Sequence, residues 1–107
     1  RFKSWVNYNN RNDYLLEHTH PYDVMTIIFY IKKPSNGGDL QILSPLLYHW
    51  QNNADTKFWR DVPANEKDVI IIPGWMMHKV SVNKSDEERI SITINAEIIN
   101  KEKDNVR

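Results

Sequence analysis

Three histidines and one arginine in this chain have the types and spacing of a metal site with an anion anchor. His18 and His20 lie two residues apart, and His78 and Arg89 follow much later. On a β-strand, residues i and i+2 project to the same face, so His18 and His20 would point into one space. Such a pair and a third histidine suit one first-row metal ion, and an arginine beside it suits a carboxylate. The spacing therefore predicts a small β-barrel that holds one metal ion and anchors one dicarboxylate.

Each of these residues also has a simpler interpretation. An isolated His-x-His pair is more often two surface imidazoles than two metal ligands. Arg89 lies on the polar side of an alternating strand, together with Ser91. If that side faces a barrel interior, the guanidinium needs a ligand carboxylate, because an unpaired buried charge is costly. If it faces solvent, Arg89 pairs with an acidic residue of the preceding turn (Asp86, Glu87 or Glu88).

Composition limits the classes of partner. The chain has 107 residues, 14 basic and 14 acidic, so its formal net charge is zero and nucleic acid is disfavoured as a partner. Cysteine is absent, so a metal site must use histidine, carboxylate, main chain or water. No apolar run approaches the roughly 20 residues that span a bilayer, so we expect no membrane partner and a cytoplasmic location. The chain begins with Arg1, which suggests a piece of a longer protein.

Short apolar runs separated by turn signals dominate the chain, and helical periodicity is scarce. The predicted strands cover residues 2–8, 15–20, 24–31, 39–43, 68–72, 78–83 and 89–97. Seven or eight short strands with little helix are typical of a sandwich, jelly roll or small barrel. We therefore predict one all-β domain over residues 1–107.

The tryptophans receive three different predictions. Residues 44–63 mix aromatic with polar side chains and predict a long connection, in which Trp50 and Trp59 are candidates for a substrate-binding loop. Trp5 is expected to be buried in the first strand. Trp75, which precedes Met76, Met77 and His78, is expected to pack against the core.

Several segments together resemble one enzyme family. They are Ser4-Trp5-Val6-Asn7, Glu17-His18-Thr19-His20-Pro21, Ile28-Phe29-Tyr30-Ile31, Gly37-Gly38-Asp39-Leu40, the run from Ile71 to His78, and the run from Glu88 to Asn95. In order and spacing the chain resembles the Fe(II)- and 2-oxoglutarate-dependent oxygenases, especially a small bacterial and phage branch with prolyl-hydroxylase-like barrels. The closing pattern, Pro-x-Trp-x-x-His followed by Arg-x-Ser, is its most specific part.

The resemblance implies a fold and a set of site residues. The fold would be a double-stranded β-helix, the jelly-roll or cupin-like barrel, around Fe(II). His18 and His78 would be metal ligands; His20 stands where most members have a carboxylate, with Asp23 as the reserve ligand. Arg89 and Ser91 would bind 2-oxoglutarate. Tyr30 and Asn7 would face this cosubstrate, or else serve as a core tyrosine and a turn asparagine.

The implied activity is a dioxygenase that uses O2, converts 2-oxoglutarate to succinate and CO2, and hydroxylates an unidentified substrate, with a peptide or protein residue favoured. Ascorbate would support it in vitro. Two alternatives stay open: a cupin-like metal-binding module without oxygenase activity, and a non-catalytic module that binds a peptide or sugar. Several surface aromatics also suggest a homodimer.

Overall fold

The computed structural model describes residues 1–19, 23–43 and 59–99. Within these ranges the chain forms eight strands and no helix, as the all-β prediction required. No helix in this part of the chain could therefore cross a membrane. The strands are β1 (Phe2–Asn9), β2 (Leu15–His18), β3 (Asp23–Lys32), β4 (Leu40–Leu43), β5 (Trp59–Val62), β6 (Val69–Pro73), β7 (His78–Val80) and β8 (Arg89–Glu97).

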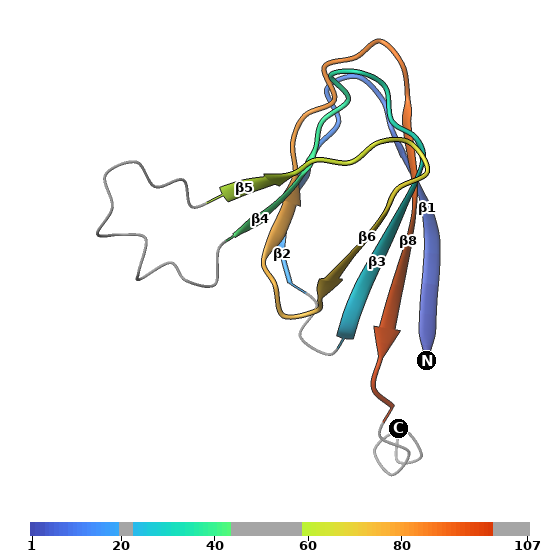
Figure 1. Cartoon of the computed structure of the whole chain (residues 1–107), viewed down its shortest axis with the longest axis vertical. Helices are drawn as coiled ribbons and strands as arrows, with labels where there is room; N and C mark the ends of the chain where they lie inside the picture. The colour runs from blue at the N-terminus through green and yellow to red at the C-terminus, as the bar shows by residue number, and fades with distance from the viewer. Residues whose placement is uncertain (20–22, 44–58, 100–107) are drawn as a thin grey trace, which may run out of the picture.

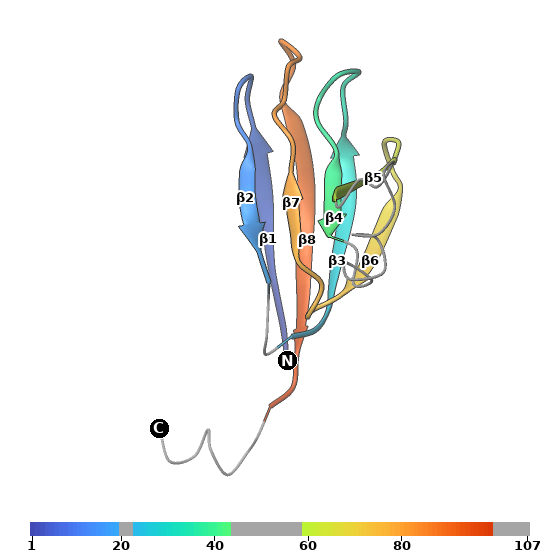
Figure 2. The same ribbon diagram turned by 90° about the vertical axis from the view of Figure 1, so that its left-hand side faces the viewer.

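The described strands form two antiparallel sheets of four, in the orders β1-β8-β3-β6 and β2-β7-β4-β5. The chain crosses between the sheets at most connections, which gives a jelly roll. Figure 2 shows β2, β7 and β4 lying over β1, β8 and β3. Figure 1 shows the sheets close together at the end with the hairpin loops and apart at the other end. Side chains from facing strands therefore meet between the two sheets.

The inner face of β8 is polar. Arg89, Ser91, Thr93 and Asn95 are buried, while the intervening isoleucines are only partly buried. The alternation in the sequence predicts these two sets of residues, and the structure shows that the polar set faces inward. An inner face with this much polar character is suited to binding a polar molecule rather than to forming a dry core.

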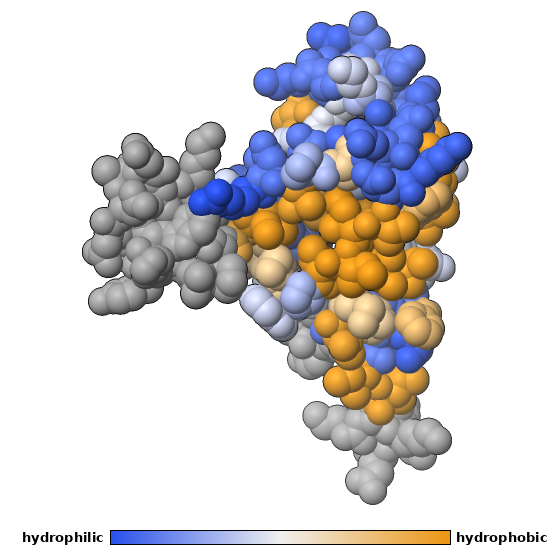
Figure 3. All heavy atoms as spheres, in the orientation of Figure 1, coloured by the Kyte–Doolittle hydropathy of each residue, from blue (hydrophilic) through white to orange (hydrophobic). Residues whose placement is uncertain are grey.

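The outer face of the β1-β8-β3-β6 sheet is apolar. Two rows cross all four strands in register: Val6, Ile92, Phe29 and Val69, then Ser4, Ile94, Ile27 and Ile71. Figure 3, which looks onto the β6 edge of this sheet, shows apolar surface around β6. The hydrophobic core is correspondingly small. Its buried members are Ile28, Tyr30, Leu40, Ala64 and Ile72.

The prediction of one long connection over residues 44–63 is wrong at its end, because Trp59 begins strand β5. This strand pairs antiparallel with β4, from Leu43 opposite Trp59 to Leu40 opposite Val62. Pairing with a neighbouring strand overrides the weak local pattern. Trp59 is therefore a strand residue, and the Lys79 ammonium lies 4.2 Å from its ring centre. Trp50, the other loop candidate, lies outside the described residues.

Two other tryptophan predictions are wrong. Trp5, expected to be buried, is 42% exposed, because β1 is an edge strand of its sheet. Its indole Nε1 donates a hydrogen bond to the Asn7 Oδ1 at 2.9 Å. Trp75, expected to pack against the core, is 61% exposed in the turn between β6 and β7.

Asn83 is fully buried and joins two loops at the end of the molecule where the sheets lie close together. The Asn83 amide donates to the main-chain oxygens of Asn9 and Glu87, and its Oδ1 accepts from the Ser85 N–H. Its main chain also bonds to Asn12 and Asp13. This one residue therefore joins the β1–β2 turn to the β7–β8 turn.

We predict that Asn83→Ala lowers the free energy of unfolding by about 2–4 kcal/mol, because it removes three part-buried hydrogen bonds of a fully buried amide. Urea unfolding measures this change. The control is Asn65→Ala at an exposed position, which should change stability by less than about 0.5 kcal/mol. Equal effects of the two substitutions would contradict the role given to Asn83.

Candidate functional site

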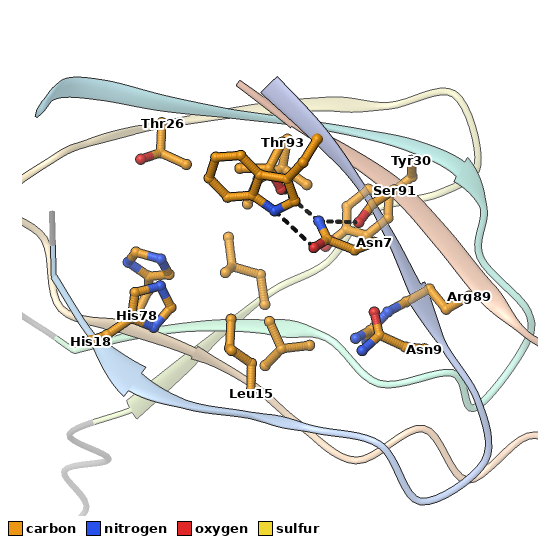
Figure 4. A pocket seen from close by; sticks show the side chains of 14 residues that line it. Asn7, Asn9, Leu15, His18, Thr26, Tyr30, His78, Arg89, Ser91 and Thr93 are labelled. Atoms are coloured by element: carbon orange, nitrogen blue, oxygen red, sulfur yellow. Dashed lines mark hydrogen bonds between the residues drawn. The ribbon is translucent and has the colours of Figure 1, made fainter. Parts of the chain in front are cut away.

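A cavity of about 190 Å³ lies between the two sheets. Figure 4 shows His18 and His78 side by side at one end, and Arg89 and Asn9 at the other. The two ends therefore differ in chemistry, with imidazoles at one and a guanidinium at the other. The apolar side chains on the wall are those of Leu15, Ile28, Leu40 and Val80, together with Trp5.

Pairing of β2 with β7 brings two histidines together. His18 is opposite His78 in register, and their ring centroids are 4.2 Å apart. Each Nδ1 lies 2.9 Å from a main-chain oxygen two residues earlier, that of Leu16 for His18 and that of Met76 for His78. A carbonyl oxygen only accepts, so each contact requires a proton on Nδ1, which in the neutral tautomer puts the lone pair of the ring on Nε2. This is how metal-binding histidines are usually oriented.

The third predicted ligand cannot be placed in the same way. His20 lies outside the described residues. Asp23 is described at the start of β3, opposite Glu97. Among described residues, no three metal-binding side chains form a group, so Asp23 does not complete a triad with His18 and His78. The ligand set stays a prediction, of which two members lie together.

Arg89 is a buried cation at the opposite end. It is 3% exposed, and its Nη1 donates to the Gly37 main-chain oxygen at 2.9 Å. Within the described ranges no carboxylate forms an ion pair with it, and Asp86 instead pairs with Arg11. The alternative that Arg89 pairs on the surface with the preceding turn is therefore wrong. The guanidinium has five N–H groups, so most of its donor capacity is available for an anionic ligand.

Gly38 leaves the room in which the guanidinium lies. Its φ is +88°, a conformation that side chains rarely adopt. A Cβ atom there would be 2.8 Å from the Arg89 Nη1 and would also collide with the main-chain oxygen of Ser81. The Gly37-Gly38 turn thus supplies both the acceptor and the space that position Arg89.

Burial dominates the electrostatics around Arg89. Desolvation raises the pKa of the Tyr30 phenol above its ordinary value and outweighs the positive charge of Arg89, which lowers it. Desolvation likewise lowers the pKa of the Arg89 guanidinium, and nearby Tyr30, Asp39 and Asp13 oppose that shift. Arginine nevertheless keeps its charge at any physiological pH. The site therefore holds a permanent positive charge beside a neutral phenol.

The amide of Asn7 supports two hydroxyl groups on β8. Its Nδ2 donates to the Thr93 Oγ1 at 2.7 Å and to the Ser91 Oγ at 3.4 Å. Its Oδ1 accepts from Trp5. These contacts occupy the amide within the protein, so Asn7 is suited to orienting neighbours. Its predicted contact with a cosubstrate stays a prediction, as do those of Ser91 and Tyr30, which line the same cavity.

Sequence reasoning missed three polar residues that line the cavity, Thr26, Thr93 and Asn9. Thr93 could have been found, because it belongs to the same polar stripe as Arg89 and Ser91. Thr26 carried one weak signal, a hydroxyl within the apolar run of β3. Nothing in the sequence marks Asn9, which lies opposite Arg89 only because β1 pairs with β8.

The raised pKa of Tyr30 predicts how stability depends on pH. The folded state keeps the phenol neutral, so its contribution is fully present below the unfolded pKa of about 10 and is lost as pH rises toward the folded value. Urea unfolding from pH 8 to 11 should show a smaller alkaline loss for Tyr30→Phe than for the unchanged protein. Equal losses in both proteins would contradict the burial effect.

Solved structures share this architecture. A prolyl-4-hydroxylase from Pseudomonas putida matches with a TM-score of 0.69 and 16% identity, over 92% of this chain and 52% of that one. A 2OG-Fe(II) family oxidoreductase from Burkholderia pseudomallei gives 0.65 and 12%, over 89% of this chain and 45% of that one. A cupin domain from Bordetella pertussis gives 0.61 and 15%, over 92% and 83%. The fold is therefore the predicted double-stranded β-helix, and the chain spans about half the length of the first two structures.

Sequence comparison identifies the family. A search of curated proteins finds no match. The family described as "Putative 2OG-Fe(II) oxygenase" matches residues 3–95, which include both histidines of the cavity and Arg89. The chain belongs to this 2OG-Fe(II) oxygenase family.

Proposed function

We propose that this protein is an Fe(II)- and 2-oxoglutarate-dependent dioxygenase that hydroxylates a peptide or protein residue. The observation that carries the proposal is the buried guanidinium of Arg89, which forms no ion pair with a carboxylate of the described residues and lines the same cavity as His18 and His78. A module that only held a metal ion would not need a buried cation facing its interior. The oxygenase is therefore favoured over the cupin-like metal module.

The residues present fit the cofactors that the family implies. His18 and His78 each donate through Nδ1 to a main-chain oxygen, the orientation usual for histidines that bind a metal ion through Nε2, and His20 is the proposed third ligand. Imidazole ligands suit iron, and a set of three neutral histidines would leave the metal charge uncompensated. That excess positive charge favours an anionic cosubstrate at the same end of the cavity.

Arg89 is proposed to bind the far carboxylate of 2-oxoglutarate. A guanidinium and a carboxylate form charge-assisted hydrogen bonds, which are strong in a buried site. The hydroxyl of Ser91 lines the cavity from the same strand and adds a further donor. Because the Gly37 oxygen and the space at Gly38 fix Arg89, the guanidinium is already in place before the anion arrives.

When bound, Fe(II) and 2-oxoglutarate supply oxidising chemistry in which one O2 oxygen enters succinate and the other enters the hydroxylated product, with release of CO2. The protein contributes orientation and exclusion of water. Leu15, Leu40 and Val80 cover one wall with apolar surface, and Asn7 holds the hydroxyls of Ser91 and Thr93 on another. Such walls keep the cosubstrate in one orientation between its two anchors.

The substrate class rests on weaker support. One of the solved structures of the same fold is a prolyl-4-hydroxylase. The zero net charge of this chain offers no general attraction for nucleic acid. Both points favour a peptide or protein residue. A homodimer stays a prediction.

We predict that the unchanged protein releases succinate from 2-oxoglutarate with Fe(II), O2 and ascorbate, even without its substrate. His78→Ala should abolish this release. Arg89→Met should raise the KM for 2-oxoglutarate by at least about thirtyfold, because it removes a charged, buried partner. Succinate is quantified by mass spectrometry.

Two controls separate loss of function from loss of fold. Arg11→Ala removes a guanidinium from a surface ion pair and should leave succinate release unchanged. Arg89→Met should not lower the free energy of unfolding by more than about 1 kcal/mol, since it removes a buried charge that no carboxylate of the described residues pairs with. If Arg89→Met releases succinate with unchanged KM, the role of Arg89 is wrong.

A further inference from the structure

Thr26 carries a buried side-chain hydroxyl on strand β3. It lies in β3, between Ile72 of β6 and Asn95 of β8, and only 1% of its surface is exposed. Its Oγ1 has no hydrogen-bond partner among the described residues. The side chain nevertheless lines the same cavity as the two histidines.

The other hydroxyls nearby are in a different situation. Ser91 and Thr93 both accept hydrogen bonds from Asn7. A buried hydroxyl that exchanges water for no partner destabilises a protein, whereas a valine of the same shape would not carry this penalty. The hydroxyl of Thr26 is thus unfavourable in the ligand-free protein, and a bound ligand with a hydrogen-bonding oxygen would remove the penalty.

The position of Thr26 indicates which part of a ligand it would meet. Thr26 and Tyr30 lie on the same face of β3, four residues and about 13 Å apart along the strand. Tyr30 lies opposite Ser91 in register, two residues from Arg89 on β8, and both Tyr30 and Arg89 line the cavity. Figure 4 shows Thr26 on the side of the cavity where His18 and His78 lie. A dicarboxylate held by Arg89 at one end would extend its other end toward Thr26.

We propose that the Thr26 hydroxyl donates a hydrogen bond to an oxygen of the 2-oxo acid group of the cosubstrate, the end that lies beside the histidines. This assignment rests on the proposed function. Thr26 and Arg89 then bind the two ends of one molecule, Thr26 through a hydroxyl with no hydrogen-bond partner among the described residues and Arg89 through the N–H groups that do not bind the Gly37 oxygen. A dicarboxylate with a 2-oxo acid at one end is the class of ligand that satisfies both.

The test compares Thr26→Val, which keeps the shape and removes the hydroxyl, with Thr26→Ser, which keeps the hydroxyl. Calorimetric titration of 2-oxoglutarate into Mn(II)-loaded protein measures affinity without turnover. We expect Thr26→Val to weaken 2-oxoglutarate binding by about tenfold, and Thr26→Ser to stay within about threefold of the unchanged protein. Affinity for Mn(II) alone should be the same in all three proteins.

Stability of the ligand-free protein supplies a second readout with the opposite sign. Thr26→Val should unfold at the same or a higher urea concentration than the unchanged protein, because the lost hydroxyl had no partner. A purely structural role would instead lower the midpoint. Weaker binding together with unimpaired stability is therefore the expected signature.

Three results would overturn the assignment of Thr26 without contradicting the proposed function. Full affinity for 2-oxoglutarate in Thr26→Val would show that the hydroxyl is not used. Equal weakening in Thr26→Val and Thr26→Ser would assign the effect to packing, and reduced ligand-free stability of Thr26→Val would assign the hydroxyl to the fold. If the unchanged protein does not bind 2-oxoglutarate at all, the proposed function itself fails and this assignment fails with it.

Discussion

The buried guanidinium of Arg89 is the charge around which one end of the cavity is arranged. A charge that is taken out of water must be compensated, and the described residues give it one main-chain oxygen and no ion-paired carboxylate. The Gly37-Gly38 turn positions the guanidinium, and the phenol of Tyr30 lines the same cavity. Asn83 donates a hydrogen bond to the main-chain oxygen of Asn9, which lies opposite Arg89. Under the proposed function, such a site would be preorganised for the carboxylate of the cosubstrate.

This constraint explains the distribution of polarity in the two sheets. In an ordinary small domain the apolar residues of a strand face the core, but here the isoleucines of β8 lie on the outer face and its polar residues line the interior. The jelly roll makes this arrangement useful, because β2 and β7 bring the histidines opposite the polar strands. One cavity therefore has two imidazoles at one end and a guanidinium at the other.

Much of this arrangement could be predicted from sequence, because strand alternation has a strict period of two. The two faces of β8 and the all-β class follow from local patterns. The pairing that places His18 opposite His78 joins distant segments, and only the family resemblance points to it. Which face of β8 turns inward does not follow from local patterns, since neighbouring strands decide it. Strand β5 exists only through its pairing with β4, and the isolated hydroxyl of Thr26 is inconspicuous in an apolar run. Asn83 binds loops that are distant in the chain, so no local pattern reveals it.

If one cavity binds a metal ion and 2-oxoglutarate together, the affinity for each ligand must depend on whether the other is bound. Calorimetric titrations of 2-oxoglutarate should be run on metal-free and on Mn(II)-loaded protein, and titrations of Mn(II) with and without 2-oxoglutarate. We predict that the metal strengthens 2-oxoglutarate binding by roughly tenfold or more, and that 2-oxoglutarate strengthens metal binding by the same factor. Equal affinity for 2-oxoglutarate with and without the metal would contradict it.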